Sequence, residues 1–236
     1  MNGGSLHAAA AMDVLGRVQD TRAQNIANAN TVGYRKRVST VETFASSLRK
    51  AAGMTLPGLR NSIDFSPGNF NQTDNPLDLV IHGKAFFAVE TEQGVRFTRN
   101  GNFTLNEQGL LVAADGSRVA GEGGPIQADP ARGPVQIDSR GKATQENEPI
   151  GALKLVEFKN EHRLIPEDSG RFKEGPDAEP FDSLESSVKQ GYLELSNVNG
   201  IDEMVQMISG LRAFQAAQKA LQGIDRTRTL GIGVRG

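Results

Sequence analysis

The chain has 236 residues, with 26 Lys or Arg against 28 Asp or Glu, and its formal net charge is −2 at pH 7. The chain therefore lacks the overall positive charge that favours nucleic-acid binding. The absence of cysteine excludes disulfides, thiol nucleophiles and cysteine-based zinc or iron–sulfur sites. Because there are only three histidines and no apolar run of about 18 residues, we expect no catalytic centre, no metal site, no cofactor and no membrane insertion.

The first segment, residues 3–28, has the spacing of an amphipathic helix. Leu15, Val18 and Ile26 belong to an apolar stripe with near-heptad spacing, and polar residues cover the other faces. A cluster of Asn and Thr ending at Gly33 then favours a turn, so the helix is expected to end there. The alanine-rich run at 8–12 is too short for a signal-peptide core and lacks a preceding basic residue, so a cleavable export signal is not indicated.

A second helix is predicted from residue 200 to about residue 228. Asn199 can cap its first turn, which carries Asp202 and Glu203 where the helix dipole favours acidic side chains. Its apolar side chains step by three and four positions, and a helix with such a stripe is stable mainly when the stripe is buried. We therefore expect the two terminal helices to pair with each other or with other copies. The expected assembly interface consists of Leu15, Val18, Ile26, Met204, Met207, Ile208, Leu211, Phe214 and Leu221.

Between the helices the apolar period changes to two, which is typical of strands. Short apolar or alternating runs fall at 77–81, 85–89, 95–98, 102–105 and 110–112. Glycine-containing turns separate them every seven or eight residues, so successive β-hairpins are expected. Six of the eleven phenylalanines lie between residues 65 and 103, which predicts a β core packed by phenylalanine. The polar segment 159–187 is expected to form long loops.

Candidate chemical sites are weak. His82 could act as a base, but no Ser or Asp partner stands at a recognised motif, so a hydrolase using His82 and nearby carboxylates is a remote alternative. Arg35, Lys36 and Arg37 form a small basic patch beside Tyr34. Three charges make a weak nucleic-acid footprint in an acidic chain, so we interpret the patch as one that forms salt bridges at a protein interface.

Residues 25–36, 66–79, 97–103 and 190–214 carry four motifs in order along the chain. Together they resemble those of the flagellar rod and hook protein family, and the match spans about residues 5–228. The N-terminal signature runs from residue 25 to residue 36, and the closing motif runs from residue 190 to residue 214. Residues 66–79 and 97–103 are similar to the core strands of the family. The residues that carry the two terminal motifs are Asn25, Asn28, Asn30, Thr31, Gly33, Tyr34, Ser196, Asn197, Val198 and Asn199. Ile26 departs from the family pattern, which has a second Asn there.

The resemblance implies a structural, non-enzymatic subunit of the bacterial flagellar basal-body rod in the periplasm, which polymerises into an axial tube and transmits torque. Its implied partners are copies of itself, other rod and hook subunits, and the flagellar type III export apparatus. The implied fold class is α+β, with long N- and C-terminal helices forming a coiled-coil-like layer around a mainly antiparallel β domain. The expected domains are a terminal helical domain at 1–36 and 196–236, an extended connector at 37–75 and a β-rich outer domain at 76–195.

The segment between the N-terminal signature and the Ser66 motif is short, and it resembles the proximal-rod, FlgF-like type more than the distal-rod, FlgG-like type. One alternative function stays open at this point. The terminal helices could instead oligomerise a β-rich adhesin or a phage-tail-like binding module.

Overall fold

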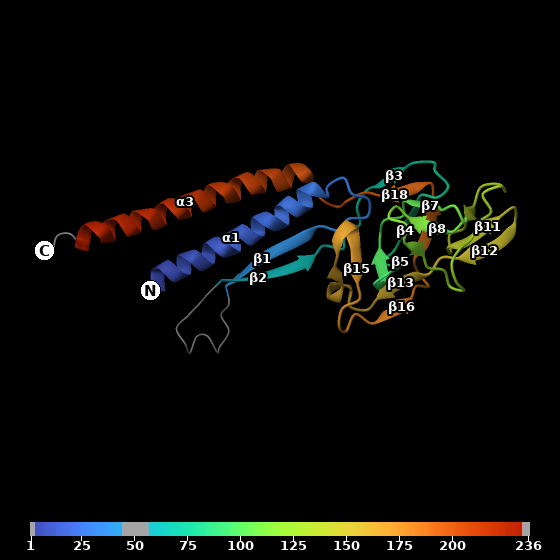
Figure 1. Cartoon of the computed structure of the whole chain (residues 1–236), viewed down its shortest axis with the longest axis horizontal. Helices are drawn as coiled ribbons and strands as arrows, with labels where there is room; N and C mark the ends of the chain where they lie inside the picture. The colour runs from blue at the N-terminus through green and yellow to red at the C-terminus, as the bar shows by residue number, and fades with distance from the viewer. Residues whose placement is uncertain (1–2, 44–56, 233–236) are drawn as a thin grey trace. The chain divides into compact units, whose positions relative to one another are not determined.

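The computed structural model describes residues 3–43 and 57–232 (Figure 1). An α-helix lies near each end of the described chain, α1 at Gly3–Ala27 and α3 at Gly200–Ile232. The strands between them are β1 Arg37–Thr43, β2 Pro57–Ile63, β3 Phe70–Gln72, β4 Leu79–His82, β5 Phe86–Thr91, β6 Gly94–Thr98, β7 Phe103–Leu105, β8 Leu111–Ala113, β9 Arg118–Val119, β10 Gln136–Ile137, β11 Lys142–Gln145, β12 Glu148–Ala152, β13 Leu155–Phe158, β14 Ile165–Pro166, β15 Arg171–Lys173, β16 Pro180–Asp182, β17 Ser187–Gln190 and β18 Tyr192–Glu194. Two short 3-10 helices, η1 Glu161–Arg163 and η2 Asp168–Gly170, flank β14. Neither α-helix is long and apolar enough, within the described ranges, to cross a membrane.

The chain divides into two compact units. The helical unit comprises Met1–Ala27, Arg37–Asp64 and Asn199–Gly236, and the β unit comprises Asn28–Lys36 and Phe65–Val198. Each unit is therefore built from segments that are distant in the sequence.

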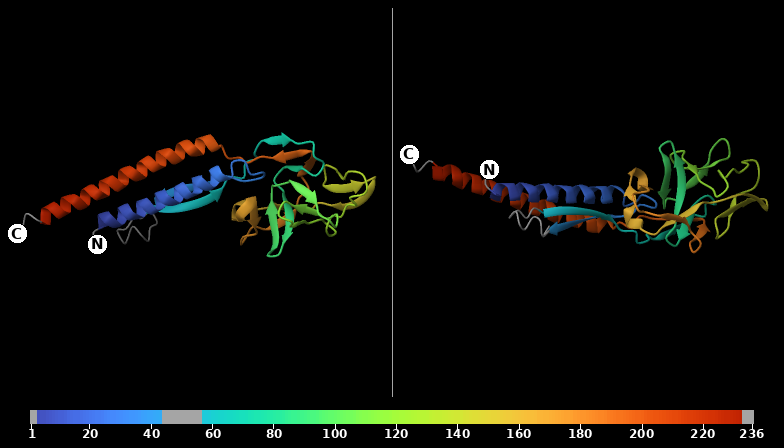
Figure 2. Two further views of the ribbon diagram at one scale, coloured as in Figure 1. Left: turned by 45° about the horizontal axis from the view of Figure 1, so that its top comes forward. Right: turned by 90° about the horizontal axis from the view of Figure 1, so that it is seen from below.

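In the helical unit, α1 packs on the antiparallel hairpin of β1 and β2, which runs beside it (Figure 2). Val14, Val18, Thr21 and Asn25 share one face of α1 because they are spaced by three and four residues. Val14 and Val18 are buried, and the Thr21 hydroxyl lies 2.7 Å from the hydroxyl of Ser39 in β1. This face of α1 therefore covers the hairpin.

A neighbouring face of α1 lies against α3 (Figure 1). The Arg22 guanidinium donates a hydrogen bond of 2.7 Å to the backbone oxygen of Gln206. At Gly210 the two helices are so close that a Cβ atom would lie 1.8 Å from the Gln19 amide nitrogen. Gly210 weakens the helix by about 1 kcal/mol relative to alanine, and it leaves room for the Gln19 side chain.

The predicted start of the second helix is confirmed. The Asn199 side-chain oxygen accepts the backbone N–H groups of Ile201 and Asp202, at 3.1 and 3.3 Å. It thereby satisfies two of the donors that have no partner within the helix at its N-terminus. Asp202 and Glu203 then lie in the first turn, as the helix dipole favours.

The β unit is organised around one large sheet with the strand order β14-β15-β6-β5-β9-β8-β7, to which β13 and β16 are attached beside β5. Smaller antiparallel sheets are formed by β10-β11-β12, by β17 with β4 and by β18 with β3. All of the pairs between named strands are antiparallel.

The predicted phenylalanine core is confirmed, and it covers both faces of β5. Phe86 is buried on one face and contacts the rings of Phe158 and Phe172, with centroids 5.8 and 5.7 Å apart. On the opposite face, Phe87 packs edge-on against Phe103 at 5.1 Å and joins the larger aliphatic core. Successive side chains of β5 point to opposite faces of the sheet, and those of both faces are buried. This strand is therefore the centre of the unit.

Most of the expected strands and turns are present, with one error of connection. The Gln93-Gly94 turn joins β5 to β6, and the Gln108-Gly109 turn joins β7 to β8. The Asn100-Gly101 sequence, however, does not make a hairpin, because β6 and β7 lie at different places in the sheet. A Cβ atom on Gly101 would lie 1.8 Å from the Leu79 carbonyl oxygen. The glycine is needed there for a close approach to β4.

The expectation of long loops at 159–187 is wrong. This segment contains η1, η2 and the strands β14, β15 and β16, and β17 begins at its last residue. Three of these strands belong to the large sheet, since β14 pairs with β15, β15 pairs with β6, and β16 pairs with β13. Strands of two or three residues show no clear alternation in the sequence, and their partners are distant in the chain.

The expected fold class is also wrong. The described residues contain two α-helices, one near each end, and the chain between them is mostly β-sheet. No coiled-coil-like layer of long helices surrounds the β domain. Instead α1 and α3 pack on each other, and α1 packs on the β1–β2 hairpin, in a unit of their own. Among the described residues, α3 still exposes Ile201, Met204, Val205, Ile208 and Leu211.

Candidate functional site: an apolar helix face and a buried ion network

One face of α3 carries large apolar side chains that are exposed. These residues are spaced by three and four positions, so they lie along a single stripe over about three turns. Between 47% and 73% of the surface of each residue is accessible. The stripe, called here the α3 apolar face, consists of Ile201, Met204, Val205, Ile208 and Leu211.

The other residues expected at the assembly interface have different environments. Met207 and Phe214 are half-buried and share a stripe with Gly210, which lies against α1. Leu15 and Ile26 are half-buried and share a stripe of α1 with Gln19 and Arg22, which contact α3. Val18 is buried toward the hairpin. Leu221 belongs to α3, but its side chain is outside the described part of the chain.

The first residue of the N-terminal motif, Asn25, fastens the end of α1 to the start of β1. Its amide nitrogen donates to the backbone oxygen of Arg37 at 2.8 Å, and its amide oxygen accepts the Arg37 N–H at 2.9 Å. Asn25 is 1% exposed. Because both halves of the side-chain amide are used, no other residue of similar size would serve equally.

The rest of the N-terminal motif forms a tight turn. The Thr31 N–H and hydroxyl both donate to Asn28, to its backbone and side-chain oxygens at 3.1 Å each, while Asn30 is exposed. Gly33 has φ +70°, and a Cβ atom there would lie 2.3 Å from the backbone nitrogen of Asn100. Tyr34 follows and is buried. The glycine of the motif is therefore required both for its backbone conformation and for close packing.

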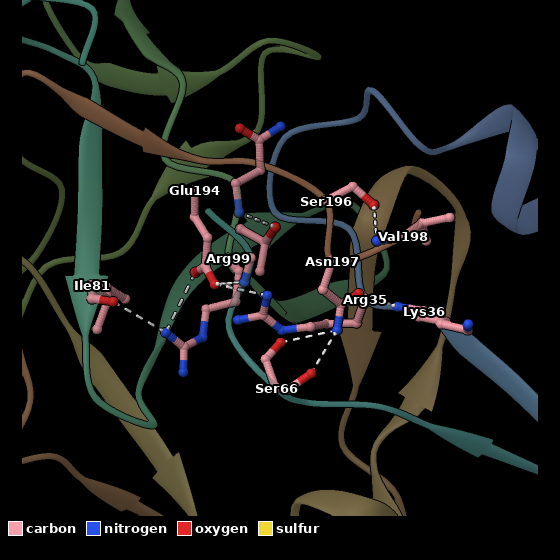
Figure 3. A network of polar contacts seen from close by, with 12 residues as sticks. Arg35, Lys36, Ser66, Ile81, Arg99, Glu194, Ser196, Asn197 and Val198 are labelled. Atoms are coloured by element: carbon pink, nitrogen blue, oxygen red, sulfur yellow. Dashed lines mark hydrogen bonds and ion pairs between the residues drawn. The ribbon is translucent and has the colours of Figure 1, made fainter. Parts of the chain in front are cut away.

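The closing motif meets this turn through Asn197. Its side-chain oxygen accepts the Lys36 N–H at 2.7 Å, and its nitrogen donates to the backbone oxygen of Ser66 at 2.9 Å (Figure 3). The Ser196 hydroxyl accepts the N–H of Val198, which is buried. Two motifs about 160 residues apart are thus joined through one side-chain amide.

A buried ion network lies between these segments, with Glu194 at its centre (Figure 3). The Glu194 carboxylate is fully buried and lies 2.8 Å from the Arg35 guanidinium and 3.7 Å from the Arg99 guanidinium. It also accepts the N–H of Gly68 at 3.0 Å, and its backbone oxygen accepts the N–H of Gly33 at 2.7 Å. One residue of β18 therefore holds the N-terminal motif and the core of the β unit together.

The electrostatics of the network are unusual because two buried arginines share one carboxylate. Burial and the charge of Arg35 lower the pKa of Arg99, Glu194 acts in the opposite direction, and the net pKa is about 10. Arg99 also donates to the backbone oxygen of Gly83 at 2.7 Å and lies 4.9 Å from the ring centroid of Phe86. Arg99 remains charged at neutral pH, so removal of Glu194 would leave two buried cations uncompensated.

The interpretation of residues 35–37 as a patch that forms salt bridges at a protein interface is wrong for Arg35, which is 2% exposed and pairs with Glu194 of the same chain. Neither Glu194 nor Arg99 is among the functional residues expected from the sequence. A signal was available, because Glu194 stands between Leu193 and Leu195 in the closing motif. A charged residue in such a position indicates a buried partner.

The remaining chemical candidate does not form a catalytic arrangement. His82 ends β4 and is exposed, and its ring packs against Phe70 with centroids 4.7 Å apart. Within the described ranges, no group of three His, Cys, Asp or Glu side chains could hold a metal ion.

Comparison with known proteins identifies the class first. Three family models match: "Flagella basal body rod protein" at residues 6–35, "Flagellar hook protein FlgE/F/G D1 domain" at 80–145 and "Flagellar basal body rod FlgEFG protein C-terminal" at 189–228. These matches place the chain among the structural proteins of the flagellar rod and hook.

Whole-chain relatives then define the family. The flagellar basal-body rod protein FlgF of Mesorhizobium japonicum is 32% identical, with 95% of this chain and 96% of that protein covered. FlgF of Rhizobium meliloti is 35% identical over 83% of this chain and 82% of that protein, and FlgG of Bacillus subtilis is 31% identical over 87% and 89%. The chain belongs to the flagellar basal-body rod protein family, and the FlgF-like type is favoured. It is a structural rod subunit of the flagellar basal body, and its rod and hook domains imply association with other rod and hook subunits.

Proposed function

We propose that the chain polymerises into the axial tube of the rod by burying the α3 apolar face against neighbouring subunits, and that it transmits torque through these contacts. The observation that carries this proposal is the exposure of five large apolar side chains along one stripe of a helix. Contiguous exposed apolar surface on a soluble protein marks an interaction site.

Burial of this face would contribute favourably to association. Complete burial of a Val, Leu, Ile or Met side chain contributes about 1.5–3 kcal/mol, and roughly half of that surface is still exposed here. The five residues together therefore offer several kcal/mol, before the cost of association is subtracted. An interface between two different surfaces of the subunit, repeated by a screw rotation that does not close, produces a tube rather than a ring. Interdigitated side chains in such an interface resist slipping when the tube rotates.

The other functional expectations remain proposals. Copies of the chain and other rod or hook subunits would be the partners, and the flagellar type III apparatus would deliver the chain unfolded to the periplasm. We propose no enzymatic activity, which is consistent with a structural family and with the exposed position of His82.

The test is a charged substitution on the proposed interface. A variant with Ile208→Glu and Leu211→Glu is compared with Ala213→Glu, whose position is exposed on another side of the same helix. All three positions are exposed, so the unfolding free energy of the free subunit should change by no more than about 0.5 kcal/mol per substitution. We expect the double variant to be absent from isolated basal bodies and the cells to be non-motile, and we expect Ala213→Glu to assemble normally.

Normal rod incorporation of the folded double variant would overturn the proposed role of the α3 apolar face. Failure of the wild-type chain itself to enter rods would overturn the proposed function as a whole.

A further inference from the structure

The β unit has a groove lined mainly by apolar side chains. It has a volume of about 430 Å³ and lies among strands β5, β6, β13 and β16. Buried Ala88, Phe97 and Val156 line it, together with Val95 and Phe181, which are 48% and 43% exposed. Two large side chains at its margin are therefore available to a partner.

Acidic side chains also line this groove. Glu90 pairs with Arg118 at 3.4 Å, while Glu174 and Asp182 take part in no ion pair among the described residues. Lys154 is the one basic residue of the lining. The groove therefore favours an apolar side chain that is flanked by positive charges.

Another part of the same unit has that composition. Ile165 in β14 is 45% exposed, and its cross-strand partner in β15 is the exposed Lys173. Arg163, two residues before Ile165, is exposed as well. Neither basic residue forms an ion pair within the described ranges. Arg163, Ile165 and Lys173 are called here the basic ridge.

The register of the sheet places the basic ridge and the groove on opposite faces. Phe172 pairs with Phe97, and side chains alternate along each strand, so Glu174 shares the groove face with Phe97. Lys173 and its partner Ile165 therefore point to the other face. One subunit cannot place its own ridge in its own groove, so the natural complement is a second copy.

We propose that the β units of neighbouring subunits contact each other head to tail, with Ile165 of one copy against Val95 and Phe181 of the next. In this arrangement the two cations of one copy's basic ridge, Arg163 and Lys173, lie near two acidic side chains of the next copy's groove. These acidic residues are Glu174 and Asp182. The inference deepens the proposed polymerisation and rests on it. Because the two surfaces differ, each pair of copies keeps a free groove and a free ridge, so the contact can repeat along an open assembly.

Cysteine cross-linking tests the contact sharply, because the chain contains no cysteine of its own. In the purified full-length chain carrying both Ile165→Cys and Val95→Cys, mild oxidation should yield a ladder of dimers, trimers and larger species. A mixture of the two single variants should stop mainly at the heterodimer, because each of its chains carries only one of the two thiols. The control pairs Ile165→Cys with Thr104→Cys, an exposed position on β7 outside the groove.

The charges provide a second readout. Lys173→Glu in the Ile165→Cys chain should slow cross-linking to the Val95→Cys chain at least tenfold. Adding Glu174→Lys to the Val95→Cys chain should restore most of the rate. A structural defect in either variant would not be repaired by a change in the other chain, so this rescue is specific to contact.

Two results would overturn the inference. One is a yield of cross-linked species no higher than that of the Thr104→Cys control. The other is a cross-linking rate that neither charge reversal changes. If either occurs while the wild-type chain still enters rods, the inference fails and the proposed function stands. If the chain enters no rods, the proposed function fails, and the cross-linking in purified chain still decides the contact.

Discussion

Glu194 combines full burial, a full charge and contacts to three separate segments of the β unit. Its carboxylate lies near Arg35 from the N-terminal motif and near Arg99 from the core, and it accepts the N–H of Gly68. A buried ion pair of this kind adds little net stability compared with apolar residues of the same shape. Breaking it by removing one partner is costly, because the remaining charges stay buried. The network therefore defines which segments come together more than it strengthens their association.

We expect Glu194→Gln to lower the unfolding free energy of the full chain by about 3–5 kcal/mol, since two buried arginines lose their counter-charge. Urea unfolding measures this loss, with Glu107→Gln at an exposed position as the control. The double variant Arg35→Ala with Glu194→Ala should lose less than the sum of the two single variants, because the partners are coupled. A Glu194→Gln variant within 0.5 kcal/mol of wild type would contradict this account.

Among the elements of the β unit, the turn between β8 and β9 is joined to β15 by an ion pair between the exposed Asp115 and the half-buried Arg171. The Arg171 guanidinium lies 2.5 Å from the Asp115 carboxylate, and the Ser117 hydroxyl donates to the same carboxylate at 2.8 Å. Partial burial raises the pKa of Asp115, but hydrogen bonds from Arg171 and Ser117 outweigh this and hold the pKa at about 2. The folded form therefore favours the charged carboxylate more than the unfolded form does.

The sign of the pH dependence follows from that depressed pKa. The stability contributed by Asp115 is fully present above its unfolded pKa of 3.8 and is lost as the pH falls toward about 2. Because the side chain is nearly half exposed, we expect Asp115→Asn to cost no more than about 1 kcal/mol at pH 6. Urea unfolding between pH 2 and pH 6 should show the two proteins converging at low pH, while a Glu122→Gln control follows wild type. A difference that stays constant across this range would rule out the ion pair as its cause.

At the scale of the whole molecule, the two units differ in how completely their apolar side chains are buried within the chain. The β unit buries both faces of its central strand β5. The helical unit leaves five large apolar side chains of α3 exposed. Helices of this kind gain most of their stability from packing, so α3 should be the less stable element of the free subunit.

Hydrogen exchange followed by mass spectrometry tests this difference. In the free subunit, amides of α3 should exchange faster than those of β5. After incorporation into rods, protection in residues 201–211 should rise at least tenfold, because neighbouring subunits cover the α3 apolar face. Protection in β5 should stay the same and serves as the internal control. Equal protection of α3 in the free and assembled protein would show that this face is not buried by assembly.

The sequence alone determined the features that depend on local chemistry. The cap at Asn199, the strands around glycine turns and the phenylalanine core follow from residue types at short spacing, and each of them is present. The family also followed from the order of the terminal motifs, and the relatives bear it out. The assembly-interface residues and the domain limits proposed from the sequence remain predictions.

Only the tertiary structure decided how distant segments combine. It paired the short strands of 159–187 with the large sheet, and it placed α1 and α3 together in one unit instead of in a helical layer around the β domain. It also showed that Arg35, expected to form salt bridges at a protein interface, is a buried partner of Glu194 in the same chain. These outcomes depend on contacts between residues far apart in the chain. Local spacing carries no information about such contacts, because a strand or a charge has the same sequence pattern whichever partner it finds.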